Sequence, residues 1–317
     1  MKSRQYWADR YVEIRQAPER AIKLIRPGQR VFIGSACGEP QVLVRALSQH
    51  ARALTGLEVV RLMSMETTPL TMIAEKSQDQ SLNVRSLYLG SGRPETIARN
   101  KRFVTPMNQS AIPRLFKSRK LPIHVALVQA SPPDDFGWMS LGVSVDISLA
   151  AAQVADLLIV QVNPRMPRVL GHSFIHVNQA DVIVEHEEAL ITVPEPPDSE
   201  RANRIGRFMA RLIDDGSTLQ ISPGTTGQAT ALALAEKNDL GIHSQFVTDT
   251  IMHLVSQGVI NNQRKGLNEG KLVASTAIGS SELYEFLDDN PGIEFSPSDY
   301  VNNPSIISGH HRMVSLN

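Results

Sequence analysis

The sequence predicts an α/β protein with mainly parallel sheets, folded as two domains. Short aliphatic or β-branched runs alternate with glycine-containing turns and longer helical stretches, which is typical of this fold class. The chain has 317 residues, and a domain holds roughly 100 to 200 residues, so two domains are expected. Hydrophobic residues make up 42% of the chain and charged residues 20%, which is ordinary globular composition and argues against extended disorder.

The first domain is predicted over residues 1–192. Its first strand, RVFIG, runs into the turn GSACGEP (34–40), where Glu39 and Pro40 are well placed before a helix with an apolar face. An alanine-rich helix later leads into a continuous apolar run, which indicates a strand covered on both faces. The strands predicted here are 30–34, 57–65, 83–92, 123–133 and the apolar part of 148–163.

A proline-rich acidic stretch, residues 193–200, is predicted to be the linker, since Pro194, Pro196 and Pro197 disfavour a helix interior and a central strand. The second domain then covers 201–317 and looks truncated, because the chain stops on a strand with no helix after it. Its predicted helices are 201–213, 228–237, 249–258 and 281–289. Its predicted strands are 217–222, 241–247, 271–279 and 313–317, with a turn at 223–227.

Charge and composition narrow the class of partner. Lys+Arg and Asp+Glu each number 32, so no net field attracts the protein to nucleic acid or to an anionic membrane. The N-terminus is too charged for a signal peptide, and no run of about 18 apolar residues occurs. Cys37 is the only cysteine, which excludes an intrachain disulfide. We expect a cytoplasmic protein whose partners are small molecules or protein subunits.

Two glycine turns at the start of helices are candidate phosphate or carboxylate sites, because backbone N–H groups are free there. They are GSACGEP (34–40) and SPGTTGQA (222–229), although most such turns bind nothing. The second lacks the lysine of a nucleotide-triphosphate loop and the third glycine of a dinucleotide fingerprint. The residues predicted to contact a ligand at these turns are Gly34, Ser35, Gly38, Glu39, Ser222, Gly224, Thr225, Thr226 and Gly227.

Other motifs carry less information. His172 and His176 have the i, i+4 spacing of metal ligands, but their segment is not helical and offers no third ligand, so no metal site is predicted. Arg93, Arg114 and Arg168 could meet phosphates or a carboxylate, although arginines of this kind are more commonly solvated surface residues.

Eight segments in one order resemble the acetyl-CoA hydrolase/transferase family, which includes acetate and 4-hydroxybutyrate CoA-transferases. The resemblance implies two α/β domains, acyl-CoA and a small carboxylate as ligands, no metal, no bound cofactor beyond the CoA substrate, and a homo-oligomer. The segments are GSACGEP (34–40), AIPRLF (111–116), HVALVQASPPDDFGWMSLGVSVD (124–146), VNPRMPR (162–168), SFIHV (173–177), LIDDGSTLQ (212–220), LGIHS (240–244) and FSPSDYVNNP (295–304).

The same resemblance implies covalent catalysis by a glutamate. That carboxylate attacks the acyl-CoA carbonyl to give an acyl-glutamyl anhydride, and the released CoA thiolate then forms a glutamyl-CoA thioester. The family motif has histidine, a small hydroxyl residue and glutamate, and this chain has His243, Ser244 and Gln245. The carboxamide of Gln245 has no ionised form near neutral pH, so we expect the anhydride route to fail.

Two further departures from the family are apparent. The second turn retains only Gly224 of the family's glycines, with Ser222 and Thr225 in place of others. Family members are also longer and carry a further glycine loop. Three interpretations therefore remain open: a CoA-transferase or, without the nucleophile, a slow acyl-CoA hydrolase; a catalytically silent acyl-CoA-binding or regulatory subunit; and a truncated homologue that needs a partner chain to complete its second domain.

Overall fold

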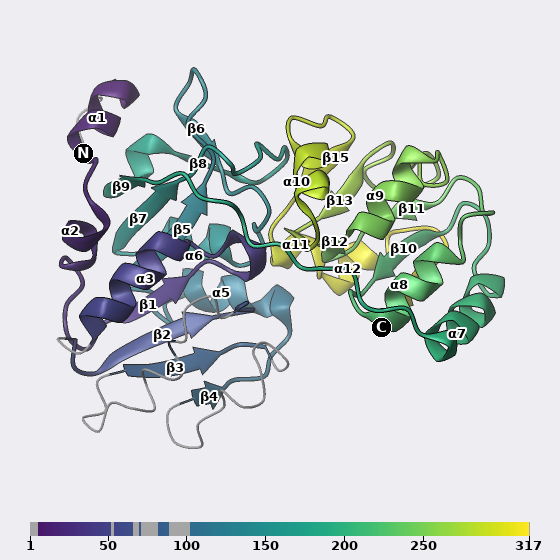
Figure 1. The fold of residues 1–317 in the computed structure, drawn as a ribbon, viewed down its shortest axis with the longest axis horizontal. Coiled ribbons are helices and arrows are strands. Elements are labelled where there is room, and N and C mark those ends of the chain that lie inside the picture. The colour runs from purple at the N-terminus through teal and green to yellow at the C-terminus, as the bar shows by residue number, and fades with distance from the viewer. Residues whose placement is uncertain (1–5, 52–53, 66–69, 71–81, 89–101, 317) are drawn as a thin grey trace. The chain divides into compact units, whose positions relative to one another are not determined.

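The computed structural model describes residues 6–51, 54–65, 70, 82–88 and 102–316 (Figure 1). The chain divides into two compact units. Unit 1 contains the residues up to Arg168 and those from Phe174 to Ile191, and unit 2 contains Val169–Ser173 and the chain from Thr192 onward. No helix in the described parts of the chain is both long enough and apolar enough to cross a membrane.

Unit 1 is built on a seven-stranded sheet in which every neighbouring pair is parallel. In spatial order the strands are β4 (Arg102–Val104), β3 (Leu82–Ser86), β2 (Leu57–Arg61), β1 (Arg30–Ile33), β5 (Val125–Ala130), β7 (Leu157–Val162) and β9 (Val182–Glu185). Its helical elements are α1 (Trp7–Glu13), α2 (Pro18–Ile22), η1 (Ala36–Gly38), α3 (Gln41–His50), η4 (Gln109–Ala111), α5 (Ile112–Lys117), α6 (Ser148–Val154) and η5 (Val177–Gln179). The predicted α/β class with mainly parallel sheets is confirmed.

Alternate side chains of β1 show how this sheet is covered on both faces. Val31 and Ile33 belong to the buried cluster that includes Leu43 and Leu47 of α3, whereas Phe32, between them, meets Phe116 of α5 at 6.0 Å between ring centroids. Successive residues of a strand point to opposite faces, so α3 and α5 lie on opposite sides of β1. A strand buried on both faces reads as a continuous apolar run, and this is why β1, β5 and β7 were recognisable in the sequence.

A small antiparallel pair was not predicted. Strands β6 (Trp138–Ser140) and β8 (Phe174–His176) pair with each other, and His176 therefore lies at a strand end. The loop before β6 is closed by Asp134, whose carboxylate accepts from the backbone N–H groups of Phe136 and Trp138.

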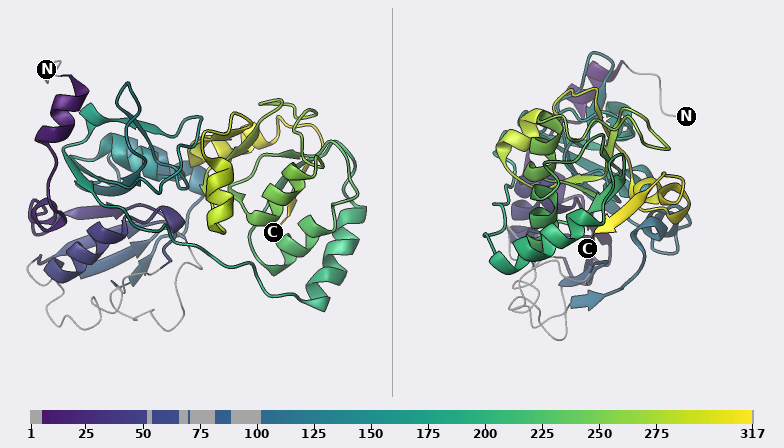
Figure 2. Two further views of the ribbon diagram at one scale, coloured as in Figure 1. Left: turned by 45° about the horizontal axis from the view of Figure 1, so that its top comes forward. Right: turned by 90° about the vertical axis from the view of Figure 1, so that its right-hand side faces the viewer.

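Unit 2 contains several short parallel strands and a set of helices (Figure 2). Strand β10 (Thr218–Ile221) lies between β11 (Gly241–Ile242) and β16 (Met313–Leu316), and two further parallel pairs join β12 (Phe246–Val247) to β14 (Thr276–Ala277) and β13 (Leu272–Ala274) to β15 (Ile293–Phe295). The helices are α7 (Glu200–Arg211), α8 (Thr225–Leu232), α9 (Asp249–Ser256), α10 (Ser281–Leu287), α11 (Ser298–Val301) and α12 (Pro304–Ile307).

Three predicted elements of unit 2 differ from the structure. The strand predicted over 241–247 is two strands, β11 and β12, interrupted at His243, Ser244 and Gln245. The strand predicted over 271–279 is likewise interrupted at Ser275. The helix predicted to begin at Gln228 begins at Thr225, so the end of the predicted glycine turn forms the first turn of α8.

Helices α7 and α8 pack at very close range through a glycine. A Cβ built on Gly206 of α7 would lie 2.5 Å from the carbonyl oxygen of Ala229 in α8 and 2.8 Å from the backbone nitrogen of Thr230. Backbone atoms cannot move aside as the end of a side chain can. Gly206 is therefore required by packing, although glycine is a poor helix former.

We predict that Gly206→Ala lowers the free energy of unfolding by about 1–3 kcal/mol, the usual cost of overpacking. Helix propensity alone would give the opposite sign, a gain of up to about 1 kcal/mol. Both tryptophans, Trp7 and Trp138, belong to unit 1, so far-UV circular dichroism during urea unfolding is the suitable measurement.

Arg207→Ala, an exposed position on the same helix, is the matched control and should change stability by less than about 0.5 kcal/mol. An increase in stability for Gly206→Ala would show that α7 and α8 are not packed as described.

Candidate functional site

Gln245 stands where the chain leaves one small sheet of unit 2 and enters another. Its backbone carbonyl accepts three hydrogen bonds, from the N–H groups of Ser275 (3.2 Å) and Thr276 (3.0 Å) and from Ser275 Oγ (3.1 Å). A carbonyl oxygen has two lone pairs, so three donors leave no acceptor capacity. The backbone at residue 245 is therefore held firmly, while its half-buried side chain extends from a fixed point.

Ser244 connects this point to the strand that precedes the second glycine turn. Its Oγ donates to the carbonyl of Ile221 (3.1 Å) and accepts from the N–H of the same residue (3.2 Å). The β10–β11 ladder pairs Leu219 with Ile242 as its last residues, so the serine hydroxyl binds the backbone of β10 where strand pairing has ended. The turn at 222–227 and Gln245 thus begin from adjacent points of unit 2.

The side chain of Gln245 is paired with that of Asn302. Asn302 Nδ2 donates to Gln245 Oε1 at 3.3 Å. Asn302 Oδ1 is buried and has no hydrogen-bond partner among the described residues, and Gln245 Nε2 has no partner among them either. One amide oxygen of the pair is thus engaged, and the amino group of Gln245 is left as a donor.

The second glycine turn is shaped by two glycines for different reasons. Gly224, the N-cap of α8, has φ +154°, a conformation that a residue with a side chain rarely adopts. A Cβ on Gly227 would come within 2.0 Å of the carbonyl oxygen of Ser222. Thr225 and Thr226 occupy the first turn of α8, whose backbone N–H groups have no partner within the helix.

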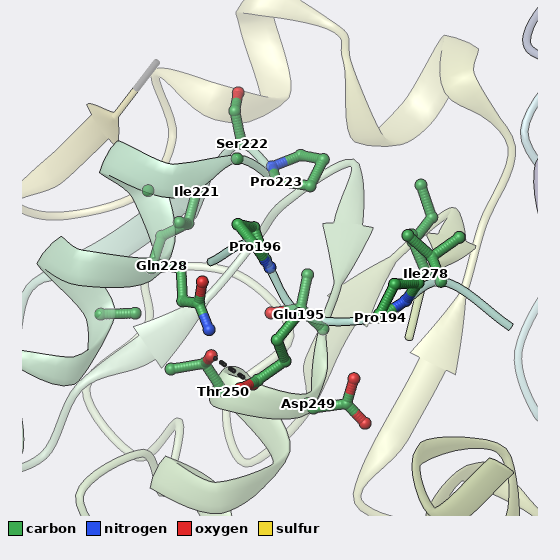
Figure 3. A pocket seen from close by; sticks show the side chains of 15 residues that line it. Pro194, Glu195, Pro196, Ile221, Ser222, Pro223, Gln228, Asp249, Thr250 and Ile278 are labelled. Atoms are coloured by element: carbon green, nitrogen blue, oxygen red, sulfur yellow. Dashed lines mark hydrogen bonds between the residues drawn. The ribbon is translucent and has the colours of Figure 1, made fainter. Parts of the chain in front are cut away.

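A pocket of about 200 Å³ opens beside this turn (Figure 3). Its walls are mostly apolar, and the polar side chains of Glu195, Gln228 and Thr250 converge on one side. Thr250 Oγ1 donates to Glu195 Oε1 at 3.2 Å. The lining residues are Val193–Pro196, Ile221–Gly224, Gly227, Gln228, Ala231, Thr248–Thr250 and Ile278. Of the predicted site residues, Ser222, Gly224 and Gly227 line this pocket, and Gln245, Thr225 and Thr226 do not.

His243, two residues before Gln245, belongs to a buried group of basic side chains with His310 and Lys265. The rings of His243 and His310 stack at 4.5 Å between centroids. His243 Nε2 lies 2.9 Å from the carbonyl of Val301, which can only accept, so this nitrogen carries the proton. The Nζ of Lys265 donates to the carbonyls of Ile242 (2.8 Å) and Lys271 (2.6 Å).

Burial disfavours the charged form of each of these three side chains and lowers its pKa. Burial lowers the pKa of His243 to about 4, and burial together with the proximity of His243 and Lys265 lowers the pKa of His310 to about 4. Burial lowers the pKa of Lys265 to about 7, against the opposing attraction of Glu294. Both imidazoles are therefore neutral at pH 7, and Lys265 is the one member of this group that carries partial positive charge there.

The first glycine turn lies in unit 1, at the carboxyl end of β1. Strand β1 has β2 on one side and β5 on the other, so this turn is at the switch point of the sheet, where open α/β sheets bind ligands. Gly38 is required by close packing, since its Cβ would lie 2.6 Å from that of Ser144. Ser35 is buried, and the N–H of Gly34 donates to the carbonyl of Leu127.

Glu39 is buried at the end of the same turn. Its carboxylate accepts from Ser64 Oγ at 3.1 Å, and its backbone carbonyl accepts from Gln129 Nε2 at 2.9 Å. Nearby Asp146 is fully buried, and burial raises the pKa of its carboxyl group despite hydrogen bonds from Ser148 and the Ile147 N–H. The four predicted residues of this turn are thus brought together in unit 1, whereas Gln245 and the second turn belong to unit 2.

Of the remaining candidates, Arg114, Arg168 and His176 lie in unit 1. Arg168 is paired with Asp134 at 3.2 Å and lies over the ring of Phe174. Arg114 is exposed on α5, and Arg93 lies outside the described residues. His176 Nε2 is 2.9 Å from the carbonyl of Phe136. In the described parts of the chain, no group of three or more His, Cys, Asp or Glu side chains is placed to hold a metal ion.

Asn302 is the residue that the sequence did not single out. It lies within the family segment FSPSDYVNNP, but nothing local indicates that its side chain reaches a position 57 residues earlier. Its hydrogen bond to Gln245 arises because α11 follows β15 and is brought to the end of β11 by tertiary packing.

The structure is that of an α/β protein with parallel sheets, in which a glycine turn follows β1 in unit 1 and another follows β10 in unit 2. Comparison with known proteins identifies the family. The model of the acetyl-CoA hydrolase/transferase N-terminal domain matches residues 1–195, and that of the C-terminal domain matches residues 279–317. The chain belongs to the acetyl-CoA hydrolase/transferase family.

Individual relatives agree with this assignment. The chain is 39% identical to 4-hydroxybutyrate coenzyme A transferase of Clostridium kluyveri over 98% of this chain and 72% of that protein. It is 32% identical to succinyl-CoA:cyclohexane-1-carboxylate CoA transferase of Geobacter metallireducens, over 95% and 68%. The crystal structure of RipA from Yersinia pestis superposes with a TM-score of 0.93 at 31% identity, covering 99% of this chain and 75% of RipA.

The neutral histidines predict an acid-sensitive fold. Because the folded-state pKa of His243 and His310 is about 4 and the ordinary value is 6.5, the unfolded chain binds more protons between these values. Stability from these two groups is complete above about pH 6.5 and is lost as the pH falls toward 4. His310→Phe should make this loss shallower, since phenylalanine cannot titrate and neither ring nitrogen of His310 has a partner among the described residues.

The measurement is the free energy of urea unfolding, followed by far-UV circular dichroism at a series of pH values across this window. His253→Gln on the exposed side of α9 is the control and should leave the pH dependence unchanged. Identical acid dependence for the wild type and His310→Phe would contradict the buried neutral pair.

Proposed function

We propose that this chain is an acyl-CoA-binding member of the CoA-transferase family that takes short-chain acyl-CoA thioesters and small carboxylates, and that Gln245 prevents the covalent step of CoA transfer. The observation that carries the proposal is the carboxamide of Gln245, which accepts a hydrogen bond from Asn302. The resemblance to the family motif implies that this residue stands where the family has its glutamate. The relatives named above as CoA transferases support the ligand class.

The chemical argument concerns the nucleophile. Transfer requires an oxygen anion at residue 245 that attacks the thioester carbonyl and expels CoA thiolate, and then accepts the thiolate to become a glutamyl-CoA thioester. The carboxamide oxygen of Gln245 is neutral at every accessible pH and is already occupied by Asn302 Nδ2. Neither the anhydride nor the thioester can form on this side chain, because both need a carboxylate.

Binding does not require that carboxylate. The N-terminal turn of α8 and its glycines, Gly224 and Gly227, can present backbone N–H groups to a carbonyl oxygen. The apolar pocket beside the turn offers space for an aliphatic part of the ligand. We further propose that Gly34, Ser35, Gly38 and Glu39 of unit 1 bind the CoA ligand, that no metal or other cofactor takes part, and that the protein is a cytoplasmic homo-oligomer.

Gln245→Glu should create transfer activity. Incubated with butyryl-CoA and acetate, the wild type should release no acetyl-CoA above background, and the variant should form acetyl-CoA at least about a hundredfold faster, because a missing nucleophile usually costs more than this. The readout is acetyl-CoA and free thiol by mass spectrometry. Gln257→Glu, an exposed glutamine at the end of α9, adds the same charge elsewhere and should have no effect.

Rapid acetyl-CoA formation by the wild type would contradict the proposal directly. Free thiol without new acyl-CoA would instead identify the wild type as a hydrolase. If Gln245→Glu binds butyryl-CoA and still transfers nothing, residue 245 is not the nucleophile position of this chain.

A further inference from the structure

We propose that Gln245 acts as a hydrogen-bond donor to the carbonyl oxygen of a bound thioester, which makes this chain select acyl-CoA over CoA and over thioether analogues. The inference rests on the proposed function, because it assigns a contact within that ligand site. It concerns what the amide does, whereas the proposed function concerns what the amide prevents.

The amides of Gln245 and Asn302 could pair in two orientations, and these differ in which atom is left without a partner. With Asn302 Nδ2 donating to Gln245 Oε1, the buried atom left without a partner is an acceptor, Asn302 Oδ1. Turning both amides around would bond Gln245 Nε2 to Asn302 Oδ1 and leave the Nδ2 amino group, with two N–H donors, buried and unpaired. Unpaired buried N–H groups are rarer than under-satisfied oxygens. The orientation in the structure is therefore the better one.

This orientation leaves the amino group of Gln245 available as a donor. Gln245 Nε2 carries two N–H groups and has no acceptor among the described residues. The backbone of Gln245 is fixed by three hydrogen bonds to its carbonyl, and its side-chain oxygen is fixed by Asn302. The amino group is thus restricted in direction before any ligand arrives, so little conformational entropy is lost when it binds.

The candidate acceptors for this amino group differ in strength. A donor of fixed direction prefers a ligand oxygen, and a thioester presents one at its carbonyl, whereas the thiol of free CoA and the sulfur of a thioether accept weakly. The basic groups near Gln245 are not available for this role. His243 Nε2 donates to the carbonyl of Val301, His310 is buried, and the Nζ of Lys265 is bonded to two backbone carbonyls.

A glutamate at 245 would reverse the polarity of this contact. A carboxylate would accept from Asn302 Nδ2, as the amide oxygen does, but its second oxygen would face the ligand as an anion. That oxygen is repelled by a carbonyl oxygen and attracted to the carbonyl carbon. Residue 245 is therefore a nucleophile as Glu and a donor to the thioester oxygen as Gln.

The test compares butyryl-CoA with S-butyl-CoA, a thioether that lacks the carbonyl, by isothermal titration calorimetry at pH 8. The wild type should bind butyryl-CoA about two- to tenfold more tightly, the usual worth of one neutral hydrogen bond. Gln245→Met, of similar length but without donors, should bind the two ligands equally. Gln257→Met, at an exposed site of the same unit, should keep the wild-type preference.

A second variant separates donation from mere packing. In Asn302→Asp, the carboxylate at 302 can only accept, so it should draw Gln245 Nε2 toward itself and turn Oε1 to the ligand. The preference for butyryl-CoA should then be lost although Gln245 is retained. Infrared spectra of carbonyl-labelled butyryl-CoA give the same answer independently: the bound carbonyl band should lie at lower frequency in the wild type than in Gln245→Met or Asn302→Asp.

The outcomes distinguish the two proposals. If neither ligand binds the wild type, the proposed function fails and this inference fails with it. If the wild type binds both ligands equally, or if Gln245→Met retains the preference and the band position, the proposed function stands and the donor role is wrong. Should Asn302→Asp prove unfolded by circular dichroism, the comparison of the wild type with Gln245→Met alone decides.

Discussion

The hydroxyl of Ser244 is the constraint on which the arrangement of unit 2 depends. By bonding both backbone groups of Ile221, it keeps β10 and the chain after β11 together beyond the last paired residues of the ladder. The backbone is thereby free to diverge at Gln245, where its carbonyl turns to Ser275 and Thr276. One serine thus links the start of the second glycine turn to Gln245.

The hydrogen bonds of Ser244 to Ile221 do not depend on the chemistry of the side chain at residue 245. Neither the backbone bonds of Gln245 nor the donor from Asn302 requires an amide, because a carboxylate could accept the same hydrogen bond. A glutamate and a glutamine at residue 245 would therefore place similar demands on the fold. A neutral side chain at this position also suits the neutral His243–His310 pair, which supplies no cation to balance an anion there.

Much of the fold was predictable because buried parallel strands have a local signature. Strands β1, β5 and β7 are continuous apolar runs, and α9 and α10 lie close to their predicted ranges. The interruption of 241–247 was not predictable, because GIHSQFV has a strand-like composition and its break depends on hydrogen bonds from distant residues. The same holds for the β6–β8 pair, whose two strands are separated by α6 and β7.

Some residues of the candidate site were predictable from sequence motifs, and others were not. The identity of residue 245 and the glycines of both turns could be read from motifs, since glycine is demanded by local geometry at Gly224 and by close packing at Gly38 and Gly227. Asn302 and His310 could not, because they reach the site only through tertiary packing.

The central claim is that residue 245 forms no covalent bond with the acyl group or with CoA, and the mass of the intact protein tests it most directly. After incubation with butyryl-CoA and rapid acid quenching, the wild type should retain its unmodified mass, while Gln245→Glu should gain the mass of CoA with loss of water. A CoA adduct mapped to Gln245 in the wild-type chain would contradict the account.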